Sequence, residues 1–348
     1  MFFMLVSAKL LSYGYRNCMS RKLLILCIYS MVSSGFGTPI SKVIIWGYKL
    51  HSHTHSYIHY GFFKAFKFLG YNVYWLDDND DLSKIDLAHS LFISTGGVDQ
   101  KIPLRQDSFY ILHNCLMDRY IRVVDPKHCI KLVVYLDSCR YRSDLQQVEE
   151  YVFYDFNDRA VHMPWATDLL PEEIDENKRA IKLPINNKNI VFIGTVAGDT
   201  IYGNSVEVNQ FKNACHQAGF SFLSRGGYGN GTGLIGIDQN IELIKSAYLA
   251  PAIQGRMQCD FGYIPCRIFK NISYGKFGIT NSKAVYNLFH KKIVYNSDPY
   301  QLCFDAIRKA STITNDEIIE QMNFVRDNHT YINRISSIME FISRLNAV

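Results

Sequence analysis

Short apolar segments alternate with helical segments in two separate series along this chain. The first series begins at Lys42–Gly47 and the second at Asn189–Ile193, which is followed directly by glycine. Pro171–Pro184, between the two series, is polar and charged. Short apolar runs that alternate with helices predict parallel strands covered by helices on both faces. Two such series in 348 residues predict an α/β protein of two doubly wound, Rossmann-like domains.

The expected boundaries follow the two series. We expect one domain over residues 42–170, a connection over 171–187 and a second domain over 188–325. Residues 1–41 precede the first strand as an extension, and 326–348 form a C-terminal helix. Three further expectations concern single elements, namely strands at Leu132–Leu136 and Leu249–Ile253 and continuous helix from Asp316 to Leu345.

The N-terminal extension contains a segment that resembles a weak signal sequence. In residues 19–35, Arg21 and Lys22 precede an apolar run and then small residues. The run Leu23–Val32 is shorter than the ~20 residues that span a bilayer, and eighteen residues precede Met19. Targeting, peripheral membrane association and a plain extension remain open. Nine cysteines without a CxxC pair indicate reduced thiols, and therefore a cytoplasmic location.

The charge distribution argues against nucleic acid as a partner. The formal net charge is +5, and the basic residues are scattered along the chain. Binding along a phosphate backbone requires basic residues concentrated in one stripe. A mild positive excess instead suits a small anionic ligand, such as a nucleoside diphosphate.

One segment of the second series, Gly262–Ser282, has the features of an anion site. Pro265 starts a predicted helix, and Asn281 and Ser282 form a polar turn after the following strand. The free N–H groups and positive dipole of a helix start suit a pyrophosphate. Arg267 and Lys270 are three residues apart and share one face of that helix, so both cations could contact the anion.

This segment resembles the donor-binding signature of GT-B glycosyltransferases, in particular the CgeB-like group. The family run is approximately Pro-x-Arg-x-Phe-Glu, a helix, a glycine and an apolar strand. Here it reads Pro265-Cys266-Arg267-Ile268-Phe269-Lys270, with Gly275 before the strand Phe277–Thr280. The resemblance covers residues 188–300. It implies two Rossmann-like domains that face each other across a cleft, and transfer of a sugar from a nucleotide-sugar donor to a glycan or other hydroxyl acceptor. It also implies that no metal or other cofactor is required.

Lys270 departs from that signature. The family has an acid there, which often holds the hydroxyl groups of the donor ribose or sugar. The substitution leaves three alternatives: a different donor, an acid supplied from elsewhere, or a protein that binds sugar without catalysis.

Further donor-side candidates follow from their positions near strand ends. Gly194 and Thr195 end the first strand of the second series, where a GT-B protein approaches its donor. Arg225 precedes a glycine-rich stretch, Arg256 lies in a loop after an apolar run, and Tyr263 precedes the predicted helix. Each of these positions would place the residue at the carboxyl edge of the sheet, where ligands of open α/β sheets bind.

A histidine cluster follows the first strand of the first series. His51, His53 and His55 lie where a GT-B protein holds its acceptor-activating base, and a histidine is a suitable base for a sugar hydroxyl. Three residues at the ends of other strands of that sheet are candidates for the acceptor side: Gly96, His113 and Asn114.

The same cluster supports an alternative from a different class of enzyme. The pattern His-x-His-Thr-x-Ser from His51 to Ser56 also resembles metal-dependent hydrolases, which need further ligands at later strand ends of a barrel. Four later residues could be recruited but form no recognisable ligand set: His113, His128, Asp137 and His162. A barrel also would not predict the polar connection at Pro171–Pro184.

Overall fold

The structure is a computed structural model. It describes residues 40, 42–49, 54–181, 183, 187–198, 203–226 and 235–346. The signal-like residues 19–35 and the predicted catalytic residues His51 and His53 lie outside the described residues. Within the described part of the chain, no helix is long and apolar enough to cross a membrane.

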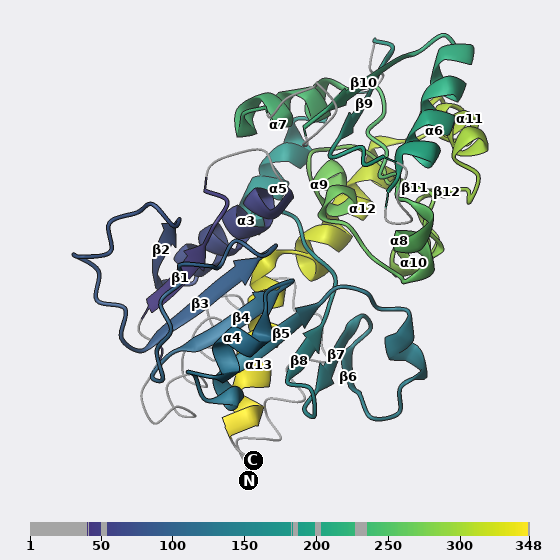
Figure 1. Cartoon of the computed structure of the whole chain (residues 1–348). Helices are drawn as coiled ribbons and strands as arrows, with labels where there is room; N and C mark the ends of the chain where they lie inside the picture. Colours follow the sequence, from purple (N-terminus) through teal and green to yellow (C-terminus); the bar gives the residue numbers. More distant parts are fainter. Residues whose placement is uncertain are drawn as a thin grey trace, which may run out of the picture.

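The first part of the chain forms one large sheet, which among the described residues has eight strands (Figure 1). Neighbouring strands β2-β1-β3-β4-β5-β8 pair in parallel, as the alternating pattern predicts, and β8-β7-β6 pair antiparallel. Their bounds are β1 Lys42–Trp46, β2 Asn72–Leu76, β3 Ser90–Thr95, β4 Phe109–His113, β5 Cys129–Val133, β6 Gln146–Glu149, β7 Val152–Asp155 and β8 Ala160–His162. Among the described strands, β2 and β6 are the two edges of an open sheet.

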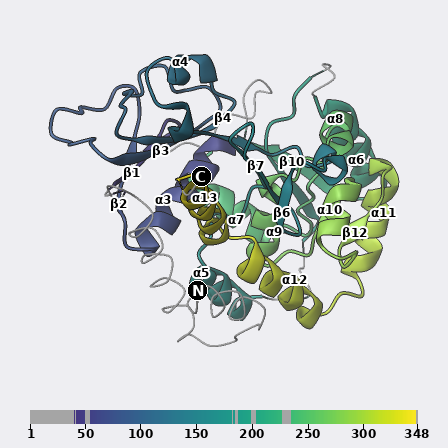
Figure 2. The same cartoon turned by 90° about the horizontal axis from the view of Figure 1, so that it is seen from below.

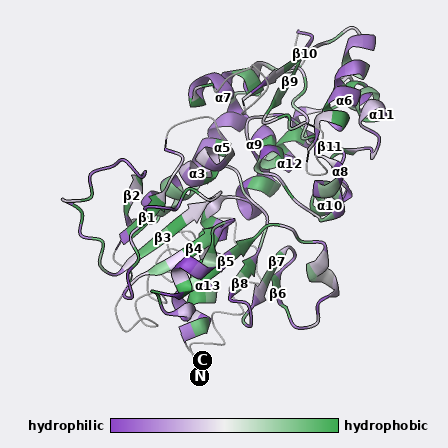
Figure 3. Cartoon of the chain, in the orientation of Figure 1, coloured by the Kyte–Doolittle hydropathy of each residue, from purple (hydrophilic) through white to green (hydrophobic). Residues whose placement is uncertain are grey.

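Both faces of the large sheet are covered. Val43 and Ile45 of β1 pack into one core with helix α3 (Thr54–Phe68), whereas Ile44 and Trp46 pack into another core on the opposite face. Alternate side chains of a strand point to opposite faces, so an uninterrupted apolar run such as β1 is the expected signature of a strand buried on both sides. In Figure 3 the central strands of this sheet are coloured mainly as hydrophobic, and the surface helix α5 (Pro171–Arg179) as hydrophilic.

The strands of residues 189–295 also pair in parallel, in two separate pairs. Strand β9 (Asn189–Ile193) pairs with β10 (Ser221–Arg225), and β11 (Ile279–Thr280) with β12 (Val294–Tyr295). The expected strand Leu249–Ile253 is not a full strand. It forms isolated bridges from Leu249 to β9 and from Ala252 to β11, and so joins the two pairs.

Helices pack around these short strands. They are α6 Ser205–Gln217, α7 Ile237–Ser246, α8 Arg256–Asp260, α9 Cys266–Ser273, α10 Lys283–Leu288, α11 Pro299–Ala310 and α12 Asn315–Asn328. Helix α4 (Met117–Ile121) and the 3-10 turns Pro126–His128 and Ser138–Tyr141 belong to the large-sheet part. The expected connection at 171–187 contains α5. Glu173 of α5 forms a salt bridge with Lys64 of α3, with 2.6 Å between Nζ and the carboxylate oxygen.

The C-terminal residues return to the large sheet. Figure 1 shows the yellow chain running from α12 to α13 (Tyr331–Asn346), and Figure 2 shows α13 beside α3. The expected continuous helix from Asp316 to Leu345 is wrong, because the chain breaks between α12 and α13. There the carbonyl of His329 accepts a hydrogen bond from the N–H of Thr167 at 3.0 Å, and Thr330 bridges to Thr167. Pairing with the segment after β8 therefore competes with helix continuation.

Arg334 anchors α13 to the segment that follows β8. Its side chain is 1% exposed, and it donates to the carbonyls of Pro164 at 2.8 Å and Trp165 at 3.0 Å. We expect Arg334→Ala to lower the free energy of unfolding by about 2–3 kcal/mol, because it leaves buried carbonyls without donors. Denaturant unfolding would measure the loss. Exposed Arg308 of α11 is the control, and a loss no larger than that of Arg308→Ala would contradict the anchoring role.

Candidate active site

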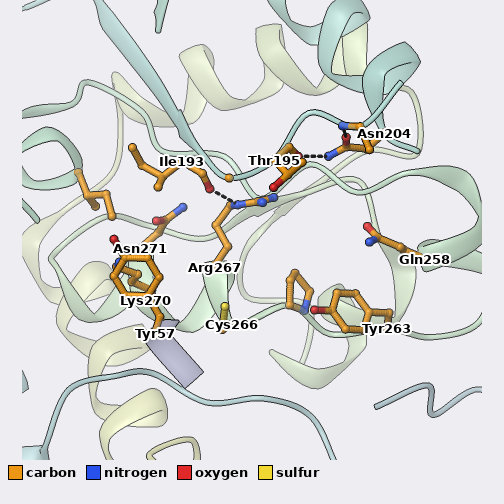
Figure 4. Close-up of a pocket in the computed structure, with 14 residues that line it drawn as sticks. Tyr57, Ile193, Thr195, Asn204, Gln258, Tyr263, Cys266, Arg267, Lys270 and Asn271 are labelled. Atoms are coloured by element: carbon orange, nitrogen blue, oxygen red, sulfur yellow. Dashed lines mark hydrogen bonds between the residues drawn. The ribbon is translucent and has the colours of Figure 1, made fainter. Parts of the chain in front are cut away.

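A cavity of about 160 Å³ lies between the small strands and helix α3 (Figure 4). Six of the residues singled out in the sequence line it: Gly194, Thr195, Tyr263, Pro265, Arg267 and Lys270. The carboxyl end of β9 and the start of α9 form one side, as the position of ligands in open α/β sheets predicts. Tyr57 of α3 contributes from the other side. The cavity is therefore bordered by both parts of the molecule.

Helix α9 presents its N-terminus and a fixed arginine to this cavity. Pro265 precedes the first turn, which contains Arg267. Arg267 donates from Nε to the carbonyl of Ile193 at 2.6 Å and from Nη1 to that of Ile253 at 3.1 Å. The guanidinium also stacks over Phe192, 4.1 Å from the ring centre. Burial lowers the pKa of Arg267, which remains charged at neutral pH. The arrangement holds a cation beside the free N–H groups of a helix start, which suits an anion.

Glycine is required at position 194 by the closeness of that arginine. Gly194 has φ +148°, and a Cβ atom there would overlap Nη2 of Arg267. We expect Gly194→Ala to displace the guanidinium and to weaken nucleoside diphosphate binding by about tenfold, the equivalent of one charge-assisted hydrogen bond. Titration calorimetry with UDP and GDP would measure the change.

The control for this substitution is Gly219→Ala. Gly219 also has a positive φ, +76°, but nothing lies within 4 Å of its Cβ position. Both variants carry backbone strain, and only the change at Gly194 should reduce binding. An equal reduction in both variants would mean that strain, rather than the position of Arg267, controls affinity.

Asn204 shapes the loop between β9 and α6. Its side chain is buried, accepts from the N–H of Ala197 at 2.9 Å and donates to the carbonyl of Thr195 at 3.3 Å. These bonds hold the Thr195–Ala197 turn against the start of α6, which keeps the turn in place at the cavity wall.

Lys270 lies one turn beyond Arg267 on α9. It is 5% exposed, its Nζ atom lies 3.3 Å from the centre of the Tyr57 ring, and it has no hydrogen-bond partner among the described residues. Burial lowers its pKa to about 8, and the charge of Asp168 opposes that shift. Asp168 itself accepts from the hydroxyl of Tyr274 at 3.2 Å.

Four predicted donor-side residues do not line the cavity. Arg256 is highly exposed and lies 3.6 Å from Asp260, and Arg225 donates to the carbonyl of Ser224. Asn281 bonds through its amide to the backbone of Gln254, and Ser282 caps α10. Their contact with a donor stays a prediction. In the structure Asn281 ties this turn to Gln254, and Ser282 stabilises the start of α10.

His55, on the first turn of α3, is the predicted catalytic histidine that the structure describes. Its Nδ1 lies 2.7 Å from Oγ1 of Thr95, at the end of β3, and its ring stacks on Tyr48. Thr95 donates its N–H to Nε2 of His59 at 3.1 Å. His59 therefore carries its proton on Nδ1, which donates to the carbonyl of Gly47 at 2.7 Å. The ends of β1 and β3 thus hold His55 in place through Thr95 and His59.

The predicted acceptor-side residues lie at the neighbouring strand ends. Gly96 donates its N–H to the carbonyl of His113 at 2.8 Å and lies against the ring of His55. His113 donates from Nδ1 to the carbonyl of Leu132 at 2.9 Å, and burial lowers its pKa, so its ring is neutral at neutral pH. Its ring centre is 6.2 Å from that of His55. Asn114 follows with φ +55° and is exposed.

Sequence reasoning did not single out several residues of the cavity wall. No motif marks these residues in the sequence, and the packing of elements distant in the sequence brings them together. They are Tyr57, Ile193, Ala197, Asn204, Ile244, Gln258, Cys266 and Asn271. Cys266 and Asn271 belong to the α9 segment that the signature covers, so this signal could have included them.

The metal alternative has no ligand set in the described part of the chain. No group of three or more His, Cys, Asp and Glu side chains is placed there to hold a metal ion. His113 and His162, which it would recruit, bind the carbonyl of Leu132 and the thiol of Cys139 through Nδ1. Because His51 and His53 lie outside the described residues, the alternative stays untested.

Comparison with solved structures identifies the architecture. An alpha-glucosyltransferase in complex with UDP and a 13-mer DNA containing a central A:G mismatch superposes with a TM-score of 0.55 at 8% identity, over 85% of this chain and 99% of that chain. The chain has the GT-B fold. A second structure, alpha-glucosyltransferase in complex with UDP, gives a TM-score of 0.54 at 9% identity, over 84% and 95% of the two chains.

The GT-B fold was predicted from the resemblance of the α9 segment, and this prediction is confirmed. No family model matches the sequence, and the search of curated proteins found no match. Membership of the CgeB-like group therefore stays a prediction.

Proposed function

We propose that this GT-B protein is a glycosyltransferase that moves a sugar from a nucleotide-sugar donor to a hydroxyl acceptor. The observation that carries the proposal is the cavity at the start of α9, where Arg267 is fixed beside the turn at Gly194. A diphosphate there would accept hydrogen bonds from the helix start and from the guanidinium. The same groups would stabilise the charge that develops on the leaving diphosphate.

The acceptor would bind at the ends of β1, β3 and β4. Tyr57, in the cavity wall, lies on the same first turn of α3 as His55, so this edge and the cavity are adjacent. The hydroxyl of Thr95 lies 2.9 Å from Nε2 of His59, the nitrogen without a proton. In the proposed arrangement the Thr95 hydroxyl donates to this nitrogen of His59 and accepts from the Nδ1–H of His55. Nε2 is then the basic nitrogen of His55.

The proposed reaction moves one proton and exchanges one bond. The acceptor oxygen forms a bond to the anomeric carbon, the bond from that carbon to the diphosphate oxygen breaks, and Nε2 of His55 takes the hydroxyl proton. Metal independence is part of the proposal, since Arg267 and the α9 dipole would provide the positive charge that a cation provides elsewhere.

A thermal-shift screen tests the proposal. The full chain is heated with UDP, GDP, ADP, CDP and their sugar conjugates, with and without EDTA. A ligand at about 100 times its Kd stabilises the folded state by about 2.7 kcal/mol, which raises the Tm by several degrees. We expect a shift with one nucleotide class that EDTA does not change. No shift with any nucleotide, together with destabilisation by EDTA, would favour the metal hydrolase instead.

The second candidate function is sugar binding without catalysis, because Lys270 stands where the signature has an acid. Release of nucleoside diphosphate from a bound donor separates the two. Binding without release under any acceptor mixture would favour the second.

A further inference from the structure

The ammonium group of Lys270 is buried without a partner in a cavity wall. Lys270 is 5% exposed, and its Nζ atom has no hydrogen-bond partner among the described residues. The contact with the Tyr57 ring, 3.3 Å from Nζ to the ring centre, compensates part of the charge and satisfies none of the three N–H donors. A buried cation in this state would be stabilised by an anionic ligand group.

The charge of the cavity wall also favours an anionic ligand. Arg267 and Lys270 line it, and none of the described lining residues carries a carboxylate. In Figure 4 the two cationic groups diverge: the guanidinium reaches toward Ile193 and Thr195, whereas Lys270 lies against Tyr57 and Asn271. A diphosphate bound by Arg267 and the α9 start would leave Lys270 to a second anionic group of the ligand.

Two uncharged groups beside Lys270 also lack partners. The hydroxyl of Tyr57 and Oδ1 of Asn271 are buried and have no hydrogen-bond partner among the described residues, and both residues line the cavity. Oδ1 of Asn271 can accept from a hydroxyl, and the hydroxyl of Tyr57 can donate or accept. Together with the ammonium they match a group that carries both a negative charge and hydroxyls.

Asp168, the described carboxylate whose charge acts on Lys270, does not replace such a ligand. Asp168 interacts with the charge of Lys270, but one of its oxygens accepts from Tyr274, and no hydrogen bond joins it to Nζ. Burial lowers the pKa of Lys270 to about 8, so the ammonium form still predominates at neutral pH.

We propose that Lys270 binds a carboxylate on the transferred sugar, so that the donor is a nucleoside diphosphate glycuronic acid. This proposal rests on the proposed function, and it specifies the substrate class of the same site. The replacement of an acid by Lys270 is then a change of donor, and the protein need not have lost catalysis.

Paired donors that differ only at the sugar carboxylate test this proposal. Titration calorimetry compares UDP-glucuronic acid with UDP-glucose, and GDP-mannuronic acid with GDP-mannose, on the wild-type chain. The same pairs are then measured on Lys270→Met, which removes the charge at similar volume, and on Lys270→Arg, which keeps it. UDP and GDP alone are measured on each variant.

We expect the wild type to prefer the acid of at least one pair by about 10–100-fold. Lys270→Met should abolish this preference with little change in the affinity for the nucleoside diphosphate alone, and Lys270→Arg should retain part of it. Lys283→Met, an exposed lysine of α10 outside the cavity, should behave as wild type.

Three results would overturn the proposal. Equal wild-type affinity for acid and neutral donors would exclude carboxylate recognition. A loss in Lys270→Met that is the same for UDP or GDP alone would place Lys270 on the diphosphate. Absence of binding by any nucleotide would reject the proposed function as well, whereas nucleotide binding without an acid preference would reject only the donor class.

Discussion

Arg267→Ala is expected to weaken the binding of a nucleoside diphosphate by about 100-fold or more. The substitution removes charge-assisted hydrogen bonds to the diphosphate, and two such bonds together contribute about 3 kcal/mol or more. Arg267→Lys should restore little, because a lysine cannot hold the carbonyls of Ile193 and Ile253 and also contact the anion. Titration calorimetry with the nucleotide that shifts the Tm would measure both variants.

The control for Arg267 is the exposed Arg308 of α11, whose partner Asp305 lies on the same helix. Arg308→Ala should bind as the wild type does. Because Arg267 also ties α9 to β9, each variant is first compared with wild type by denaturant unfolding. A folded Arg267→Ala protein with unchanged affinity would contradict the donor site.

His55→Ala is expected to reduce turnover by about 10²–10⁴-fold while the donor Kd changes less than threefold. A positioned general base contributes a factor of this size to the rate, and donor affinity depends on the other side of the cleft. The measurement is release of nucleoside diphosphate in the presence of an acceptor mixture, with donor binding measured separately by calorimetry.

Two further variants make the result for His55 specific. His216→Ala changes an exposed histidine of α6 and should leave turnover unaffected. Thr95→Val removes the hydroxyl that contacts Nδ1 of His55, so it should reduce turnover less than the loss of the histidine does. Wild-type turnover in His55→Ala would mean that another group takes the proton, and neutral His113 on the same sheet edge would be tested next.

The parts of the fold that could be predicted from the sequence depend on local patterns. Strands β1 and β9 are apolar runs followed by glycine, and α9 begins at a proline, so their own residues specify them. The expected strand at Leu132–Leu136 is shifted to Cys129–Val133. Its pairing with β4 and β8 sets the register, and Tyr135 beyond it bridges to Tyr263 instead. Such pairing between distant segments leaves no local pattern.

The candidate site shows the same limit. Arg267 and Gly194 lie at positions that strand and helix ends predict, and they meet in the cavity. Asn281 and Ser282 also follow a strand end, but Asn281 hydrogen-bonds to the backbone of Gln254 and Ser282 caps α10. The contact of Lys270 with Tyr57 joins two helices far apart in the sequence, so only the packed structure reveals it.

The most direct test of the donor site uses Cys266 as a reporter. This partly buried thiol lines the cavity at the first position of α9, and burial raises its pKa, so slow alkylation with iodoacetamide can be followed by mass spectrometry. We predict that the nucleoside diphosphate that raises the Tm slows the labelling of Cys266 severalfold and leaves Cys115, outside the cavity, unchanged. Unchanged labelling of Cys266 at a saturating concentration of that nucleotide would contradict binding in this cavity.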